Sequence, residues 1–277
     1  MPKNKRNIFI FCLLAVFVVI FGLYYIWQNN QKEKVAQQNE SNGQPRVLGI
    51  ISNPRGPDEL RTYPKFAQKG ELNLSKISAK SFLAFNPLTG QILLEKSANI
   101  QIPIASLTKL LTALVTYEKL DLGSEIEISM ADTMDISPSL KLQPGEKVKV
   151  LDLFNAMLIG SNNDAALALA NHVAKATNQN FVNLMNKKAK DLGMSNSKFS
   201  NPLGFDSKEN FSTAKDLVLL INNLEKLAVI KNLGKQTSYK FISKDGNSYF
   251  TESTNKLIKT HSDLEAIKTG FTSNSLG

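Results

Sequence analysis

Residues 106–117 contain a single charge, that of Lys109, and this stretch most constrains how the chain can fold. Leucines recur there at helical spacing, so residues 103–120 are predicted to form a helix. A helix that turns one face to water normally carries several charges on that face, whereas the face opposite these leucines carries small or weakly polar residues. The helix is therefore expected to be buried on most sides, within a core formed by other elements.

Burial changes the chemistry expected of Lys109. A lysine removed from water loses the solvation of its charged form, so its pKa falls and it becomes a base near neutral pH. Ser106 precedes it by three residues, about 60° around the helix axis, so the serine Oγ can approach the lysine Nζ. The alternative is that Ser106 caps the helix while Lys109 stays in water.

The Ser-x-x-Lys spacing alone has little specificity, because the chain contains four such pairs. The pair formed by Ser106 and Lys109 differs from the others in lying within an apolar helix. This context favours a nucleophilic serine with a lysine base at that position. The other pairs are Ser195/Lys198, Ser212/Lys215 and Ser253/Lys256.

Two polar motifs further along the chain suit the same chemistry. Ser161-Asn162-Asn163 falls between two predicted helices, where a hydroxyl and a carboxamide can relay a proton and hold a substrate amide. Lys268-Thr269-Gly270 falls in an apolar strand pattern, where Gly270 lets another backbone approach and the other two residues offer a charge and a hydroxyl to a carboxylate. The alternatives are a helix C-cap followed by an N-cap, and a lysine that protects an edge strand.

The remaining pattern predicts a mixed α+β domain. Apolar runs around Gly90 predict a hairpin over 80–96, and the Asp245-Gly246 turn predicts a second over 238–253. A further strand is expected over 264–272. Since strands lie at both ends with helices between them, the terminal segments are expected to share one antiparallel sheet.

Helices are predicted over 150–160, 165–176, 181–192 and 213–227. Gly160 is placed to end the first of these helices. The expected N-terminal caps are Asn163 or Asp164 for the second, and Ser212 or Thr213 for the fourth.

Residues 8–27 carry no charge and, at 1.5 Å per residue, span about 30 Å, the thickness of the hydrocarbon core of a bilayer. Basic residues precede this segment, so the positive-inside rule leaves the N-terminus in the cytoplasm and exports the rest. Residues 1–28 are therefore interpreted as a membrane anchor, with a cleaved signal peptide as the alternative. Residues 29–76 are expected to form a polar linker and an extended segment that leads to a domain over 77–277.

Composition argues against several other functions. The net charge is +9, but basic residues are spread along the chain, so no nucleic-acid partner is expected. The one cysteine, Cys12, lies in the apolar N-terminal segment, which leaves no intrachain disulfide. The two histidines, His172 and His261, do not indicate a zinc hydrolase, and no metal or other cofactor is expected.

Taken in order, the motifs SLTK at 106–109, SNN at 161–163 and KTG at 268–270 resemble those of serine penicillin-interacting enzymes. Blocks such as LIGSNNDAALALA narrow the resemblance to the D-alanyl-D-alanine carboxypeptidase family of low-molecular-mass penicillin-binding proteins, over about residues 77–277. This resemblance implies an α+β fold, an antiparallel sheet flanked by helices with a largely helical subdomain inserted. The family continues through further core strands, so the domain is expected to be incomplete after residue 277.

The resemblance implies a serine-type D-Ala–D-Ala carboxypeptidase that acts on peptidoglycan stem peptides. Ser106 would form the acyl-enzyme, and Lys109 would accept its hydroxyl proton. Ser161 and Asn163 would relay protons and hold the substrate amide. A β-lactam would mimic the dipeptide and acylate Ser106 as an inhibitor.

The resemblance also implies how the substrate is held. Lys268 and Thr269, next to Gly270, would bind the terminal carboxylate. The N–H groups of Ser106 and Phe271 would form the oxyanion hole. The expected partners are a stem peptide ending in D-Ala–D-Ala, β-lactams and the cytoplasmic membrane.

Two other functions stay open at this stage. A class A β-lactamase shares the first and third motifs but needs a glutamate for deacylation, and the candidates Glu209 and Asp206 lack the expected surroundings. A membrane-tethered module that binds peptidoglycan without catalysis is the second. Within the peptidase interpretation, carboxypeptidase, endopeptidase and transpeptidase reactions use the same motifs.

Overall fold

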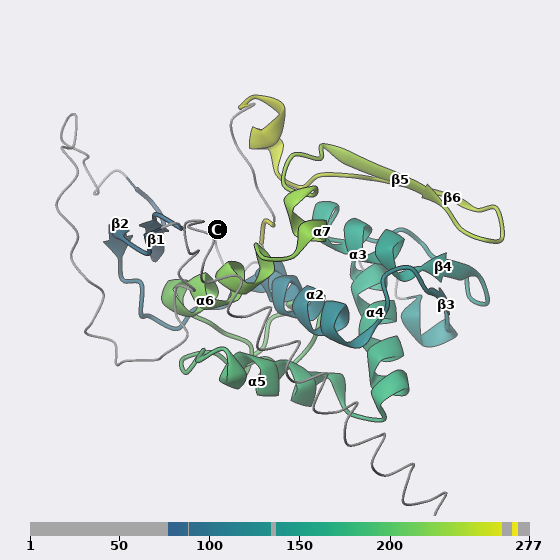
Figure 1. Ribbon diagram of the computed structural model, residues 1–277, viewed down its shortest axis with the longest axis horizontal. Coiled ribbons are helices and arrows are strands. Elements are labelled where there is room, and N and C mark those ends of the chain that lie inside the picture. Colours follow the sequence, from purple (N-terminus) through teal and green to yellow (C-terminus); the bar gives the residue numbers. More distant parts are fainter. Residues whose placement is uncertain (1–76, 88, 134–136, 262–267, 271–277) are drawn as a thin grey trace, which may run out of the picture. The chain divides into compact units, whose positions relative to one another are not determined.

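Within the part of the chain that the structure describes, helix α2 (Thr108–Lys119) packs against four other α-helices (Figure 1). The structure, a computed structural model, describes residues 77–87, 89–133, 137–261 and 268–270. Every residue of α2 from Thr108 to Thr116 is buried, and only its last turn is exposed, which confirms the prediction from its lack of charge. The helices around it are α3 (Val150–Ile159), α4 (Asn163–Thr177), α5 (Phe181–Asp191) and α6 (Ala214–Leu224).

The helices over 150–224 occur where their spacing predicts them, but one cap differs. Thr213 caps α6 as expected, because its side chain accepts a hydrogen bond from the Asp216 N–H. The N-cap of α4 is Asn162, so the expectation of Asn163 or Asp164 is wrong. The buried carboxylate of Asp164 instead accepts a hydrogen bond from the Ser139 hydroxyl at 2.8 Å, which ties a loop to the start of α4.

The described strands pair as separate two-stranded antiparallel sheets. Two of these sheets are hairpins and confirm the predictions from sequence, and Gly90 and Gly246 have positive φ in their turns, at 71° and 89°. The third sheet was not predicted, because each of its two strands has three residues with one apolar residue between two charges. The pairs are β1 (Phe82–Phe85) with β2 (Ile92–Lys96), β3 (Glu125–Glu127) with β4 (Lys147–Lys149), and β5 (Ser238–Ile242) with β6 (Ser248–Glu252).

The expected strand over 264–272 lies mostly outside the described residues. The joining of the terminal segments into one sheet therefore stays a prediction. Four short helices of the described residues were not predicted from the sequence. They are η2 (Ala105–Leu107), η3 (Met130–Asp132), α7 (Ala228–Lys231) and η4 (Lys256–Lys259).

A buried carboxylate holds the β5–β6 hairpin in place. Glu146 accepts hydrogen bonds from the Tyr249 hydroxyl, from Asn247 Nδ2 at 3.0 Å and from the Gln143 N–H at 2.7 Å. Burial, together with the bond to Glu146, raises the pKa of the Tyr249 phenol. Strand β6 is thereby fixed, and its end carries Ser253 and Thr254 to the candidate site.

Gly160 ends α3 as predicted, but the reason for a glycine there is packing. Its backbone is right-handed, with φ −93°, and the positive φ falls on Ser161 at 62°. A Cβ at Gly160 would lie only 1.8 Å from Oγ1 of Thr251 on β6. The lack of a side chain at Gly160 therefore allows strand β6 to pack directly against the C-terminal end of α3.

The proposed membrane segment 8–27 and the linker 29–76 lie outside the described residues. Within the described part of the chain, no helix combines the length and the apolar character needed to cross a bilayer. The described residues all belong to one compact unit.

Candidate active site

Ser106 lies in the 3₁₀ turn η2, which leads directly into α2. Ala105, the residue before it, has a positive φ of 46°, a strained conformation for a residue with a Cβ. Ile104 and Leu107 are the N-cap residues of η2 and α2, so the interpretation of Ser106 as a helix cap is wrong. The turn instead leaves the serine hydroxyl next to the side chain of Lys109.

The Nζ atom of Lys109 donates hydrogen bonds to three acceptors. These are Ser106 Oγ at 3.2 Å, Asn163 Oδ1 at 2.8 Å and the Leu203 carbonyl oxygen at 2.6 Å. The Lys109 side chain is fully buried, at 0% exposed, so the interpretation of a solvated lysine is wrong. Burial lowers the pKa of Lys109 to about 7, and the positive charge of Lys268 contributes to this lowering.

The other Ser-x-x-Lys pairs have different environments. Lys198 forms an ion pair with Glu209 at the surface. The hydroxyl of Ser212 bonds to that of Ser197, and Lys256 is exposed. Among the described residues, only the pair at 106 and 109 has its lysine Nζ bonded to its serine Oγ, as the helix context predicts.

The second motif lies at the start of α4, beside Lys109. Asn163 Oδ1 accepts from Lys109, while Asn163 Nδ2 donates to the Ser137 carbonyl at 3.3 Å and its backbone N–H donates to the Pro138 carbonyl at 2.7 Å. Ser161 is buried, and within the described part of the chain its hydroxyl has no hydrogen-bond partner. Asn163 is thus fixed in place, while the Ser161 hydroxyl is left for another group.

The third motif, residues 268–270, lies close to the backbone of the turn that carries Ser106. A Cβ on Gly270 would lie 3.0 Å from the Ile104 carbonyl oxygen and 3.3 Å from the Leu107 nitrogen, so glycine permits this approach, as predicted. Burial lowers the pKa of Lys268 to about 7. Phe271 lies outside the described residues, so its part in an oxyanion hole stays a prediction.

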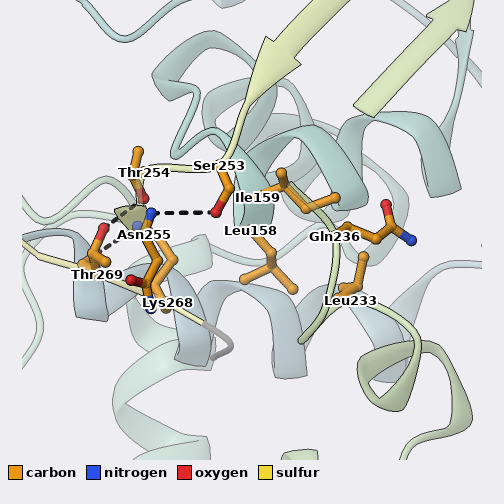
Figure 2. Close-up of a pocket in the computed structure, with 9 residues that line it drawn as sticks. All are labelled: Leu158, Ile159, Leu233, Gln236, Ser253, Thr254, Asn255, Lys268 and Thr269. Atoms are coloured by element: carbon orange, nitrogen blue, oxygen red, sulfur yellow. Dashed lines mark hydrogen bonds between the residues drawn. The ribbon is translucent and has the colours of Figure 1, made fainter. Parts of the chain in front are cut away.

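A small pocket opens beside Lys268 and Thr269 (Figure 2). Figure 2 shows the hydroxyls of Thr254 and Thr269 facing each other, and they form a hydrogen bond. Leu158 and Ile159, from the end of α3, contribute aliphatic surface to the same pocket. A cation and hydroxyls beside aliphatic side chains suit a carboxylate attached to a small apolar group.

The charged groups around Ser106 in this arrangement are lysines. Lys109 and Lys268 are close enough for the charge of the second to lower the pKa of the first. A site with two such amines attracts anions, which fits a substrate that ends in a carboxylate. Across the residues that the structure describes, no group of three or more His, Cys, Asp or Glu side chains is arranged to hold a metal ion.

Two groups at the site were not predicted from the sequence, the Leu203 carbonyl and Thr254. Asn201-Pro202 followed by Gly204 is typical of a turn, but the pattern does not show that the turn reaches a lysine 94 residues earlier. A backbone acceptor has no residue type by which it could be recognised. Thr254 is one of many threonines, and only its pairing with Thr269 distinguishes it.

Comparisons with known proteins identify the family of this chain. Residues 67–275 match the D-alanyl-D-alanine carboxypeptidase family. The D-alanyl-D-alanine carboxypeptidase DacF of Bacillus subtilis is 32% identical over 218 residues, which cover 75% of this chain and 55% of that protein. The chain spans about half the length of the curated relatives it matches.

Solved structures share the fold at similar identity. The crystal structure of a D-alanyl-D-alanine carboxypeptidase from Mycobacterium tuberculosis superposes with a TM-score of 0.64 at 29% identity, over 71% of this chain and 74% of that one. The Streptomyces K15 DD-transpeptidase superposes with a TM-score of 0.66 at 27% identity, over 72% and 82%. These likenesses confirm the expected α+β fold of the penicillin-binding proteins. The chain belongs to the D-alanyl-D-alanine carboxypeptidase family.

Proposed function

We propose that the protein is a serine-type D-Ala–D-Ala carboxypeptidase, which removes the terminal D-alanine from peptidoglycan stem peptides in the bacterial cell wall. The observation that carries this proposal is the 3.2 Å contact between Ser106 Oγ and Nζ of the buried Lys109. A general base must reach the proton it abstracts and have a pKa near the working pH, and Lys109 meets both conditions. The names of the relatives support the choice of substrate.

In the proposed reaction, neutral Lys109 accepts the hydroxyl proton while Ser106 Oγ attacks the carbonyl carbon of the D-Ala–D-Ala bond. The tetrahedral intermediate collapses and the C–N bond breaks, while the proton that Lys109 accepted is passed through the Ser161 hydroxyl to the nitrogen of the departing D-alanine. An ester on Ser106 remains, and water hydrolyses it to restore the hydroxyl. Asn163, already bonded to Lys109, holds both the lysine and the amide of the substrate.

The terminal carboxylate of the substrate is proposed to bind at the third motif. The ammonium of Lys268 supplies charge and the Thr269 hydroxyl a hydrogen bond, at the edge of the pocket in Figure 2. Gly270 lets this segment lie against the turn of Ser106. The N–H groups of Ser106 and Phe271 would stabilise the oxyanion, and losing one such donor costs about 3 kcal/mol of transition-state binding.

The N-terminal sequence supports a location at the outer face of the cytoplasmic membrane. Residues 1–28 are proposed to anchor the protein there with its N-terminus inside, residues 29–76 to act as a linker, and residues 77–277 to form the catalytic domain. The support is the uncharged run over 8–27 and the basic residues before it.

The surroundings of Glu209 do not favour the β-lactamase alternative, in which this residue would act as the base for deacylation. The side chain of Glu209 is 57% exposed and forms an ion pair with Lys198. A base for deacylation needs to face the acyl-enzyme rather than the solvent. The non-catalytic alternative does not account for a buried lysine with a pKa near 7 beside a serine hydroxyl.

The purified protein is expected to acquire one covalent label from a fluorescent penicillin and to release D-alanine from a pentapeptide ending in D-Ala–D-Ala. Trypsin digestion and mass spectrometry should place the acyl group on Ser106, in the peptide 97–109. A label on another residue would refute Ser106 as the nucleophile. Label without release of D-alanine from a folded protein would refute the carboxypeptidase, and rapid turnover of penicillin without peptide cleavage would favour a β-lactamase.

The pH dependence of acylation gives a second test, through Lys268. Measured at saturating penicillin, so that the bound carboxylate keeps Lys268 protonated, the labelling rate should rise with pH and reach half its maximum near the Lys109 pKa of about 7, because only the neutral amine accepts a proton. Replacing Lys268 with methionine keeps the site filled but removes a positive charge, so the pKa of Lys109 rises and the half-maximum moves to higher pH. Rates measured between about pH 5 and pH 9 test this. Lys256→Met, at an exposed position, is the control and should not move the half-maximum; an unmoved half-maximum in Lys268→Met would contradict the charge interaction.

A further inference from the structure

The turn at residues 201–205 supplies the shortest hydrogen bond to Lys109. The Leu203 carbonyl oxygen accepts from Nζ at 2.6 Å, whereas the side-chain acceptors Ser106 Oγ and Asn163 Oδ1 lie at 3.2 Å and 2.8 Å. A backbone carbonyl has no rotamer to change, so the turn alone sets its direction. The position of Nζ relative to the serine hydroxyl therefore depends on the shape of this turn.

One side chain, that of Asn201, holds the turn together. Its Oδ1 accepts from the backbone N–H groups of Leu203 at 3.1 Å, Gly204 at 2.8 Å and Phe205 at 3.0 Å. Its Nδ2 donates to the Phe205 carbonyl at 3.1 Å. Such side-chain bonds replace the backbone ladder that a turn lacks. Without this oxygen, three N–H groups would lose their acceptor and the turn would rearrange.

The same turn contacts both elements that carry the reacting groups. Thr112 on α2, one turn after Lys109, donates its hydroxyl to the Pro202 carbonyl at 2.7 Å. Gly204 has a φ of 89°, and a Cβ there would lie 2.0 Å from the carbonyl oxygen of Ala105, the residue before Ser106. The turn thus packs between the start of α2 and the turn of the serine, where a small displacement alters the geometry of both.

We infer that Asn201 is a positioning residue for acyl transfer: by holding the turn at 201–205, it directs the Leu203 carbonyl at Lys109 and so aims the amine at Ser106. The inference rests on the proposed function, since it requires Lys109 to act as the base. A carbonyl acceptor also favours the protonated amine over the neutral one. Loss of Asn201 should therefore misdirect Lys109 and at the same time lower its pKa.

The chain offers a matched control for this test in Asn186. Its Oδ1 accepts from the Phe199 N–H at 3.0 Å, and its Nδ2 donates to the carbonyls of Phe199 and Val182 at 2.7 and 2.9 Å. Like Asn201 it is half-buried and holds nearby backbone, but its bonds do not include the turn at 201–205. Alanine removes four side-chain bonds to backbone at Asn201 and three at Asn186, so the two variants separate loss of stability from loss of positioning.

The experiment measures labelling by a fluorescent penicillin against pH, below the melting transition of every variant, for the wild type, Asn201→Ala, Asn201→Asp and Asn186→Ala. Asn201→Ala should lower the maximal acylation rate at least about 10-fold and move the half-maximum about half a pH unit lower. Asn186→Ala should keep the maximal rate within about twofold of wild type and leave the half-maximum in place. The carboxylate of Asn201→Asp can accept the same three N–H bonds, so this variant should regain most of the lost rate.

Each outcome has a distinct meaning. A maximal rate of Asn201→Ala within twofold of that of Asn186→Ala, or an unmoved half-maximum, overturns the positioning role and leaves the proposed function intact. The same holds if Asn201→Asp is as slow as Asn201→Ala. A wild-type protein that acquires no label overturns the proposed function itself, and the inference with it.

Discussion

Replacing Lys109 with methionine is expected to lower the rate of acylation by penicillin by about 10³-fold while the protein stays folded. Methionine matches the length of the lysine stem but has no atom that can accept the proton of Ser106. The residual rate would come from binding and from the N–H groups around the attacked carbonyl. The measurement is the labelling rate at a pH above the Lys109 pKa of about 7, where the wild-type amine is neutral.

The stability of Lys109→Met should change little, because two effects oppose each other. Methionine removes a fully buried amine whose charged form is poorly solvated, which favours folding. It also leaves the Leu203 carbonyl without its 2.6 Å donor, which disfavours folding. The free energy of unfolding, from urea denaturation, should therefore stay within about 2 kcal/mol of wild type.

Lys119→Met provides the control for this variant. Lys119 lies in the last turn of the same helix and is exposed, so the same substitution there removes a charge without touching the site. Its labelling rate should equal that of the wild type. If Lys109→Met also labels at the wild-type rate while folded, another group is the base and the proposed mechanism is wrong.

The burial of Lys109 could be predicted because its signal is local. One charge in a helix with leucines on one face and small residues on the other implies that both faces are covered, and α2 is indeed buried from Thr108 to Thr116. The same local periodicity predicts α3 to α6, and turn residues such as Gly90 predict the hairpins β1–β2 and β5–β6. The order of the three motifs then identifies the family, which local pattern alone does not.

What escaped prediction depends on contacts between distant segments. The bond from Lys109 to the Leu203 carbonyl joins residues 94 positions apart, and no property of leucine indicates it. Gly160 was expected to end a helix, which it does, but the need for glycine comes from Thr251 on β6. Similarly, Asp164 fits a cap by type, yet its buried carboxylate instead accepts a hydrogen bond from the Ser139 hydroxyl of a preceding loop. In each case a tertiary contact decides between roles that the local sequence allows.

Gly204→Ala is expected to lower the free energy of unfolding by at least about 3 kcal/mol and to abolish most acylation. An added Cβ would lie 2.0 Å from the carbonyl oxygen of Ala105, 2.4 Å from its carbonyl carbon and 2.9 Å from the Ser106 nitrogen. These are backbone atoms, so no rotamer change relieves the overlap, and either the turn at 201–205 or the turn of Ser106 must move. A displacement of about 1 Å there should cost about 100-fold in the acylation rate of the protein that remains folded.

Gly246→Ala separates the overlap from the cost of the backbone conformation. Gly246 has the same φ of 89°, but a Cβ there would meet nothing within 4 Å, at the exposed tip of the β5–β6 hairpin. Alanine at this position therefore incurs only the left-handed strain, about 1 kcal/mol, and should leave the labelling rate unchanged. Urea denaturation gives the free energy of unfolding of both variants, and labelling gives their acylation rates. The difference between Gly204→Ala and Gly246→Ala is the effect of the overlap with the turn that carries Ser106. Equal losses of stability in the two variants, with labelling retained in Gly204→Ala, would mean that the turn at 201–205 does not press on Ser106 as described.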